Sequence, residues 1–128
     1  SNSNRMTIDA SGNVGIGMTN PTYQLQLSTD SAAKPGTSTW TIASDERLKD
    51  VGAPFTRGLD AINGLNTVYF NYSKDNPLNL PSDKEYVGIR AQDVQKVIPE
   101  AVSTDDQGYL HVTNDSIIWT AVNAIKEL

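Results

Sequence analysis

The first 43 residues contain too few apolar side chains to build a hydrophobic core, and this constrains the fold more than any other feature. They are rich in Ser, Thr, Gly and Asn, and their charged residues are Arg5, Asp9, Asp30 and Lys34. A domain needs a buried apolar core to offset the entropy that the chain loses on folding. We therefore expect residues 1–43 to belong to some larger assembly.

The composition changes at Ser44. Residues 44–128 carry all the remaining charge, 8 Lys or Arg against 13 Asp or Glu, so the whole net charge of -5 lies there. With 38% hydrophobic residues, a chain of 128 residues is long enough for one modest globular domain. We therefore divide the chain into residues 1–43 and residues 44–128, and we expect it to be a fragment of a longer protein.

The first part alternates apolar and polar residues in three short stretches, at residues 6–10, 14–18 and 23–27. A period of two indicates β-strands, and the residues between these stretches are typical of turns. Glycine on one face lets backbones approach closely, as in three chains that wind around one another in a fibre. The same pattern fits an ordinary meander at a domain edge, and the pattern alone does not decide between the two.

The second part mixes helical and strand patterns, which predicts a small α+β domain. A short strand over residues 39–43 is expected to lead the chain to Ser44. Phe55, Leu59 and Ile62 then recur at helical spacing, with Gly64 as a C-cap. Further patterns predict strands at 68–72 and 86–89, a helix at 92–97, a hairpin across 101–112 and a closing helix from Asn114 or Asp115.

The closing helix carries an apolar stripe. Ile118, Ala121, Ile125 and Leu128 recur at spacings of three, four and three residues, as the a and d positions of a coiled coil do. Fewer than two heptads cannot hold an isolated coiled coil together. The stripe therefore predicts either packing on the domain's own sheet or a seam where three helices meet, and both can hold at once.

Ser44 and Lys49 are the two side chains that a Ser/Lys hydrolytic dyad requires. A serine hydroxyl needs a base, and lysine is a base only after its ammonium has lost a proton. Ser44 would attack the carbonyl of Ala43 in an N-to-O acyl shift, and water would hydrolyse the resulting ester. Attack on the bond between Ser44 and Asp45 is the alternative. Positioning within one chain would supply much of the rate.

A structural interpretation competes with this chemistry. Ser44 followed by Asp45 and Glu46 is typical of a helix N-terminus, with Ser44 as N-cap and both acids favoured by the helix dipole. Lys49 would then be a solvated lysine in the first turn. Residues five positions apart do not face one another on a helix. A dyad therefore needs a bent loop within one chain, or a Lys49 from a neighbouring chain.

The sequence gives little support to other chemistry. It contains no cysteine and a single histidine, His111, so a thiolate or multi-histidine metal site is not expected. Asp105 and Asp106 lack the spacing of a calcium loop and favour a turn. The acidic balance disfavours nucleic acid. No apolar run approaches the roughly 20 residues that span a bilayer, and no signal peptide is recognised. We expect no metal, cofactor, nucleic-acid or membrane partner.

Four stretches of the second part, residues 44–49, 69–72, 87–102 and 121–128, resemble a known module. It is the self-cleaving C-terminal intramolecular chaperone domain of phage endosialidase tail spikes and tail fibres, and it also resembles a module of the myelin regulatory factor family of eukaryotic transcription factors. The resemblance covers essentially all of the second part. Upstream, the glycine-rich residues 12–17 resemble the fibre shaft that often precedes this domain.

The resemblance implies a homotrimeric chaperone that aligns the three chains of a fibre and is then released by cutting its own chain. Ser44 and Lys49 would be catalytic, and Asp45 and Arg47 would support the motif, Arg47 by pairing with an acid. The chaperone would act in the host cytoplasm during virion assembly, on the upstream shaft of the same chain. The shaft itself would stay in the virion tail after cleavage.

Two alternatives come from other functional classes. In the first, the domain is a permanent trimerisation or receptor-binding tip whose dyad is inactive. In the second, cleavage frees a DNA-binding part from a membrane, as the resemblance to the myelin regulatory factor family of transcription factors implies. The shaft-like residues 12–17 and the lack of an apolar span disfavour the second alternative.

Overall fold

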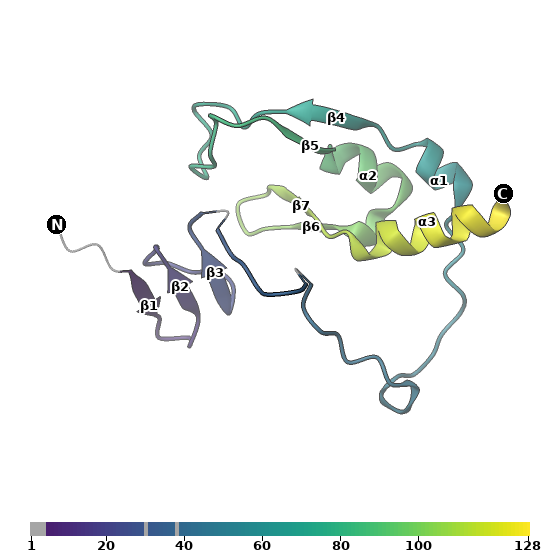
Figure 1. Ribbon diagram of the computed structural model, residues 1–128, viewed down its shortest axis with the longest axis horizontal. Helices are drawn as coiled ribbons and strands as arrows, with labels where there is room; N and C mark the ends of the chain where they lie inside the picture. Colours follow the sequence, from purple (N-terminus) through teal and green to yellow (C-terminus); the bar gives the residue numbers. More distant parts are fainter. Residues whose placement is uncertain (1–4, 30, 38) are drawn as a thin grey trace. The chain divides into compact units, whose positions relative to one another are not determined.

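The chain forms two compact units, Ser1–Lys49 and Asp50–Leu128, in a computed structural model (Figure 1). The structure describes residues 5–29, 31–37 and 39–128. The fibre segment predicted over residues 1–43 therefore includes residues 1–4, 30 and 38, which lie outside the described residues. The boundary between the units follows Lys49, so Ser44 and Lys49 both belong to the first unit.

The first unit contains a three-stranded sheet with the order β1-β2-β3. β1 pairs with β2 in antiparallel register, and β2 pairs with β3 in parallel register. The three strands lie within the three alternating stretches of the sequence, so these predictions are confirmed. Their bounds are β1 (Met6–Ile8), β2 (Val14–Ile16) and β3 (Leu25–Leu27).

Asp9 closes the turn between β1 and β2. Its Oδ1 atom accepts hydrogen bonds from the backbone nitrogens of Ser11, at 2.8 Å, and Asn13, at 2.9 Å. Gly12 has a φ of 83° in this turn, a left-handed conformation that glycine adopts without a steric penalty. The backbone bond from Asn13 is the main reason that the pKa of Asp9 lies below its ordinary value.

The sheet of the first unit has no apolar core among its described residues. Met6 and Ile8 leave 64% and 65% of their surface exposed, and Leu25 leaves 46%. The buried hydrophobic residues of the described chain all lie in the second unit. The first unit therefore leaves apolar surface exposed, as expected for a segment with so few apolar residues.

The strand expected at residues 39–43 is not formed, so that prediction is wrong. The segment is irregular and exposed, and Trp40 and Ile42 leave 74% and 69% of their surface in contact with solvent. Alternation supplies a strand with suitable faces, but the strand also needs a neighbour for its backbone hydrogen bonds. No such neighbour pairs with these residues in the described chain.

The second unit is a small α+β domain, which confirms the predicted fold class. It combines two antiparallel two-stranded sheets, β4-β5 and β6-β7, with three helices (Figure 1). The elements are α1 (Leu59–Asn63), β4 (Thr67–Phe70), β5 (Tyr86–Ile89), α2 (Ala91–Val97), the 3-10 turn η2 (Pro99–Ala101), β6 (Val102–Thr104), β7 (Leu110–Val112) and α3 (Asp115–Glu127). The predicted strands, hairpin and closing helix are thereby confirmed.

The core of the second unit is built around α2 and the turn that follows it. Val94, Ile98 and Ala101 are almost completely buried and contact one another. Side chains from both sheets and from the other two helices pack against this cluster. They are Ala61, Leu65, Ile89, Val97, Val102, Val112 and Ile117.

The helix predicted from the spacing of Phe55, Leu59 and Ile62 begins later than Phe55, so its expected start is wrong. α1 begins at Leu59, after Gly58, and ends at Gly64 as predicted. Phe55 lies outside the helix, and its carbonyl accepts a hydrogen bond from the distant Asn123 side chain at 2.9 Å.

α3 is apolar on two different sides. Thr120 and Ala124 are buried against the domain, with Ile117 packed on the core. Ile118 and Ile125 point elsewhere and leave 51% and 71% of their surface exposed. The interpretation in which the stripe of Ile118 and Ile125 packs on the domain's own sheet is therefore wrong for these two residues. Among the helices that the structure describes, none is long and apolar enough to cross a membrane.

Candidate functional site

A single 3-10 turn, η1 (Glu46–Leu48), organises the motif around Ser44. Asp45 is its N-cap, and its Oδ1 atom accepts a hydrogen bond of 2.9 Å from the backbone nitrogen of Arg47. The Asp45 carbonyl accepts a second bond, from Leu48 nitrogen at 3.0 Å. The expectation that Ser44 is an N-cap is therefore wrong, because Asp45 takes that position and leaves the Ser44 hydroxyl free of capping.

Arg47 folds back onto the cap. Its guanidinium donates to both oxygens of Asp45, at 3.0 Å from Nε and 2.7 Å from Nη2. This pair lowers the pKa of Asp45 and raises the pKa of Arg47. Both side chains are exposed, so the pair contributes little stability, and its effect is to hold the conformation of the turn.

The turn brings the two residues of the expected dyad into contact. The Nζ atom of Lys49 donates a hydrogen bond of 2.6 Å to the Oγ atom of Ser44. Regular helical spacing would point these side chains in different directions. The contact arises because only residues 46–48 are helical, while Asp45 and Lys49 have extended backbone conformations on either side. The bent loop that a dyad within one chain requires is therefore present.

The site is open in the single chain. Ala43, Ser44 and Lys49 are all exposed, so water reaches the nucleophile, the base and the peptide bond that joins Ala43 to Ser44. The Ala43 carbonyl accepts no hydrogen bond from the described part of the chain. Acyl transfer requires donors for the oxygen that becomes negative in the transition state. Among the described residues, the dyad is thus aligned while no donor contacts the Ala43 carbonyl.

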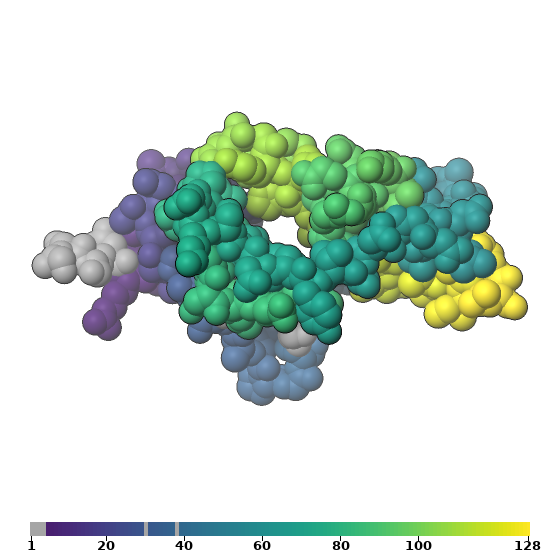
Figure 2. Space-filling model, turned by 90° about the horizontal axis from the view of Figure 1, so that it is seen from above, coloured from purple at the N-terminus to yellow at the C-terminus, as the bar shows by residue number. Residues whose placement is uncertain are grey.

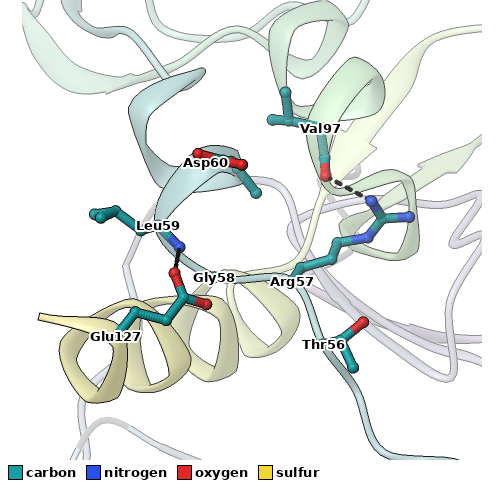
Figure 3. Close-up of a pocket in the computed structure, with 8 residues that line it drawn as sticks. Thr56, Arg57, Gly58, Leu59, Asp60, Val97 and Glu127 are labelled. Carbon is teal, nitrogen blue, oxygen red and sulfur yellow. Dashed lines mark hydrogen bonds between the residues drawn. The ribbon is translucent and has the colours of Figure 1, made fainter.

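Hollows lie elsewhere in the described part of the chain, within the second unit. One, of about 510 Å³, is lined by Arg57, Gly58, Glu127 and their neighbours (Figure 3). The other, of about 590 Å³, lies between β4-β5 and the β6-β7 hairpin, where the space-filling view shows an opening (Figure 2). Neither is lined by Ser44 or Lys49. The dyad is therefore an exposed surface site rather than a pocket.

The lone histidine has a structural role in the β6-β7 hairpin. Its Nε2 atom lies 2.9 Å from Oδ2 of Asp105, whose other oxygen accepts bonds from the backbone nitrogens of Gln107 and Tyr109. The bond with His111 is the main reason that the pKa of Asp105 lies below its ordinary value. In the described ranges, no three His, Cys, Asp or Glu residues group as a metal site would require. The sequence interpretation of Asp105 as a turn residue is confirmed.

The sequence interpretation missed two residues that contact the chain downstream of the dyad. Asn123 and Glu127, both on α3, hydrogen-bond to the backbone of residues 55–59. Helical periodicity assigns both residues to a polar side of α3 and therefore marks them as solvated. No local pattern indicates that a backbone segment 68 positions earlier lies against them.

Residues 44–103 match a protein family whose model is described as chaperone of endosialidase and is named as a peptidase family. The match begins at Ser44, the first residue of the turn motif, and extends to β6. It confirms the resemblance inferred from the sequence. No curated protein matches the chain.

Proposed function

We propose that the chain trimerises, aligns a phage tail spike or fibre, and releases itself by cutting at Ser44, because residues 44–103 match the endosialidase chaperone family. The contact of 2.6 Å between Ser44 Oγ and Lys49 Nζ carries this proposal. It unites a nucleophile with the one type of base that a Ser/Lys dyad uses. The partners are two further copies and the upstream shaft of the same chain.

The first chemical step is an N-to-O acyl shift. The neutral amine of Lys49 takes the proton of the Ser44 hydroxyl as Oγ attacks the carbonyl carbon of Ala43. The bond from that carbon to the Ser44 nitrogen then breaks, and the nitrogen takes the proton back from Lys49. Water hydrolyses the ester that forms. The products are a carboxylate at Ala43, a free hydroxyl on Ser44 and a new amino terminus at Ser44.

Ring size favours the bond between Ala43 and Ser44. Attack of Oγ on the preceding carbonyl passes through a five-membered ring. Attack of Oγ on the carbonyl of Ser44 itself, which would cut before Asp45, requires a strained four-membered ring. The carbonyl of Ala43 is also free of other hydrogen bonds in the described chain, so it is available to donors from a neighbouring chain.

The exposed side of α3 supports the trimer. Ile118 and Ile125 are one heptad apart, and Val122 lies between them on the same side. All three are exposed in the single chain, so the domain does not use them for its own core. A seam of three such helices would bury this stripe, and Ala121 and Leu128 complete it as the sequence indicates. The exposed apolar residues of β1, β2 and β3 would be covered by the intertwined end of the shaft.

Trimer formation would also complete the active site. A lysine removed from water favours its neutral form, and an oxyanion needs donors, whereas no donor contacts the Ala43 carbonyl in the described chain. Neighbouring chains can provide both conditions at Lys49 and Ala43. Cutting would then follow assembly in the host cytoplasm and leave the shaft in the virion tail.

A permanent, uncut trimeric tip is the second candidate function. It is favoured by the exposure of Ser44 and Lys49, since an exposed motif need not be a working site. The intact mass and N-terminal sequence of the purified chain separate the two functions when compared with Ser44→Ala. A fragment that begins at Ser44 in the wild type alone supports self-cleavage, and two intact chains support the permanent tip.

A further inference from the structure

Residues 55–59 form a strap that lies against α3, and the side chains of α3 bond to its backbone. Nδ2 of Asn123 donates to the carbonyls of Phe55 and Arg57, at 2.9 Å each. Oε2 of Glu127 accepts a bond of 2.7 Å from the backbone nitrogen of Leu59 (Figure 3). Asn123 and Glu127 are four positions apart, so they project from the same side of the helix. The strap is therefore held at three points of its backbone.

Gly58 allows the strap to lie this close to α3. A Cβ atom at position 58 would sit 1.8 Å from Oε1 of Glu127 and 2.6 Å from its Cδ. A side chain at position 58 would therefore have to displace the Glu127 carboxylate. The glycine and the glutamate are thus fitted to one another.

The strap is held from its other side as well. Arg57 donates to both carboxylate oxygens of Glu100, at 3.0 and 2.8 Å. It also donates to the carbonyl of Val97 at 3.0 Å (Figure 3). The domain thus fixes the strap through α3 on one side and through the end of α2 on the other. By contrast, the described backbone of residues 50–54 makes no hydrogen bonds within the chain.

We propose that Asn123 and Glu127 are positioning residues for self-cleavage, which make cutting depend on a docked α3. This inference rests on the proposed function. Phe55 follows Lys49 by six positions, so the tether between dyad and strap spans at most about 20 Å. The place where α3 holds the strap therefore limits where the dyad can lie.

α3 can contribute to the proposed trimer seam and also hold the strap, because different residues occupy its two sides. At about 100° of rotation per residue, Asn123 and Glu127 project from the side opposite Ile118 and Ile125. α3 can therefore pack on neighbouring chains through one side while it holds the strap with the other. A loose α3 would release the strap, lengthen the free tether and lower the effective concentration of the motif at residues 43–49 near the groups of neighbouring chains that are proposed to complete the site.

The test follows cutting of the full chain during cell-free synthesis, with trimer content measured on the same samples. Asn123→Ala and Glu127→Ala should each slow cutting about tenfold at unchanged trimer content. Glu127→Gln keeps an oxygen that accepts from Leu59 and should restore most of the rate. Lys126→Ala, a neighbouring exposed position, should cut at the wild-type rate.

Gly58→Ala tests the same contact from the strap, because its Cβ atom would displace the Glu127 carboxylate. Alone it should slow cutting by pushing the Glu127 carboxylate away from Leu59. In the Glu127→Ala background it should have no further effect, because the group that it displaces is gone. Additive losses in the double variant would overturn the inference. In an uncut Ser44→Ala background, hydrogen exchange at the Leu59 amide should speed up in Glu127→Ala.

The outcomes separate this inference from the proposed function. A wild-type chain that is never cut defeats self-cleavage, and the positioning role with it. Wild-type cutting combined with undiminished cutting in Asn123→Ala and Glu127→Ala defeats the positioning role alone. Loss of the trimer in both variants also overturns it, because the two residues would then stabilise α3 rather than position the dyad.

Discussion

The Nζ atom of Lys49 lies 2.6 Å from the Oγ atom of Ser44, although the residues are five positions apart. A continuous α-helix would turn the second side chain about 140° away from the first. The contact depends on a 3-10 turn that is only three residues long and is capped by Asp45. Asp45, which caps this turn, thus determines whether the side chains of Ser44 and Lys49 come into contact.

Asp45→Ala should slow cutting about tenfold, because it removes both the cap of η1 and the partner of Arg47. Asp45→Asn keeps an oxygen that can accept from the Arg47 backbone and should retain more of the rate. The measurement is the first-order rate of cutting of each variant at equal trimer content. Equal rates in wild type and Asp45→Ala would show that the turn does not align the dyad.

Ile125→Asp should dissociate or unfold the trimer. The side chain is 71% exposed in one chain, and the proposed seam would bury three aspartates around one axis. Burial of an unpaired charge costs several kcal/mol per site. Light scattering across micromolar concentrations measures the change. Lys126→Gln alters the net charge by the same amount on an exposed position and is the matched control.

A trimeric Ile125→Asp variant with an unchanged melting temperature would contradict the seam. The same experiment on Ile118→Asp guards against a local effect at the end of the helix. A monomeric wild type would remove the trimer itself and, with it, the proposed means of covering the dyad.

Ile98→Ala should destabilise the second unit by about 2–5 kcal/mol, because it leaves a cavity at a fully buried position. Val87→Ala, at a site that is 69% exposed, should change the stability far less. Denaturant unfolding in an uncut Ser44→Ala background measures both. Similar losses for the two variants would mean that the core is not centred on α2.

Acid should weaken the β6-β7 hairpin through Asp105. Its pKa is lowered from 3.8, first by the bond with His111, so the folded state binds this proton less readily than the unfolded state does. The stabilisation is therefore present above about pH 4 and is lost as the pH falls through the folded pKa. The melting temperatures of wild type and Asp105→Asn should converge on acidification. A constant difference would contradict this role.

Much of the fold could be predicted from the sequence, because its elements carry their own periodicity. β1, β2 and β3 follow alternation of period two, and α3 begins at Asp115 as its capping residues indicate. The absence of an apolar core among the described residues of the range 1–43 also follows from composition, which sets how much apolar surface a segment can bury.

The remainder depends on contacts between residues that are distant in the sequence. Phe55 has helical spacing but lies outside the helix, where its carbonyl accepts a hydrogen bond from Asn123. Trp40 and Ile42 alternate with polar residues as in a strand, but no strand of the described chain pairs with this segment. The contact between Ser44 and Lys49 requires a short turn rather than a longer helix, and the cap at Asp45 stabilises that turn. Local patterns do not encode these choices.

The central claim is that Ser44 cuts its own chain with Lys49 as the base. Ser44→Ala removes the nucleophile, and Lys49→Arg removes a base that can be neutral, since arginine stays protonated. Both variants should therefore remain intact while they keep the fold and the trimer, and in the wild type the rate should be independent of protein concentration once trimers have formed.

The most direct test is the intact mass of the wild-type chain after long incubation at pH 8, beside Ser44→Ala. We predict a wild-type fragment that runs from Ser44 to Leu128 and a single uncut mass for the variant. A wild-type chain that stays whole while folded and trimeric would contradict self-cleavage and leave the permanent tip as the function.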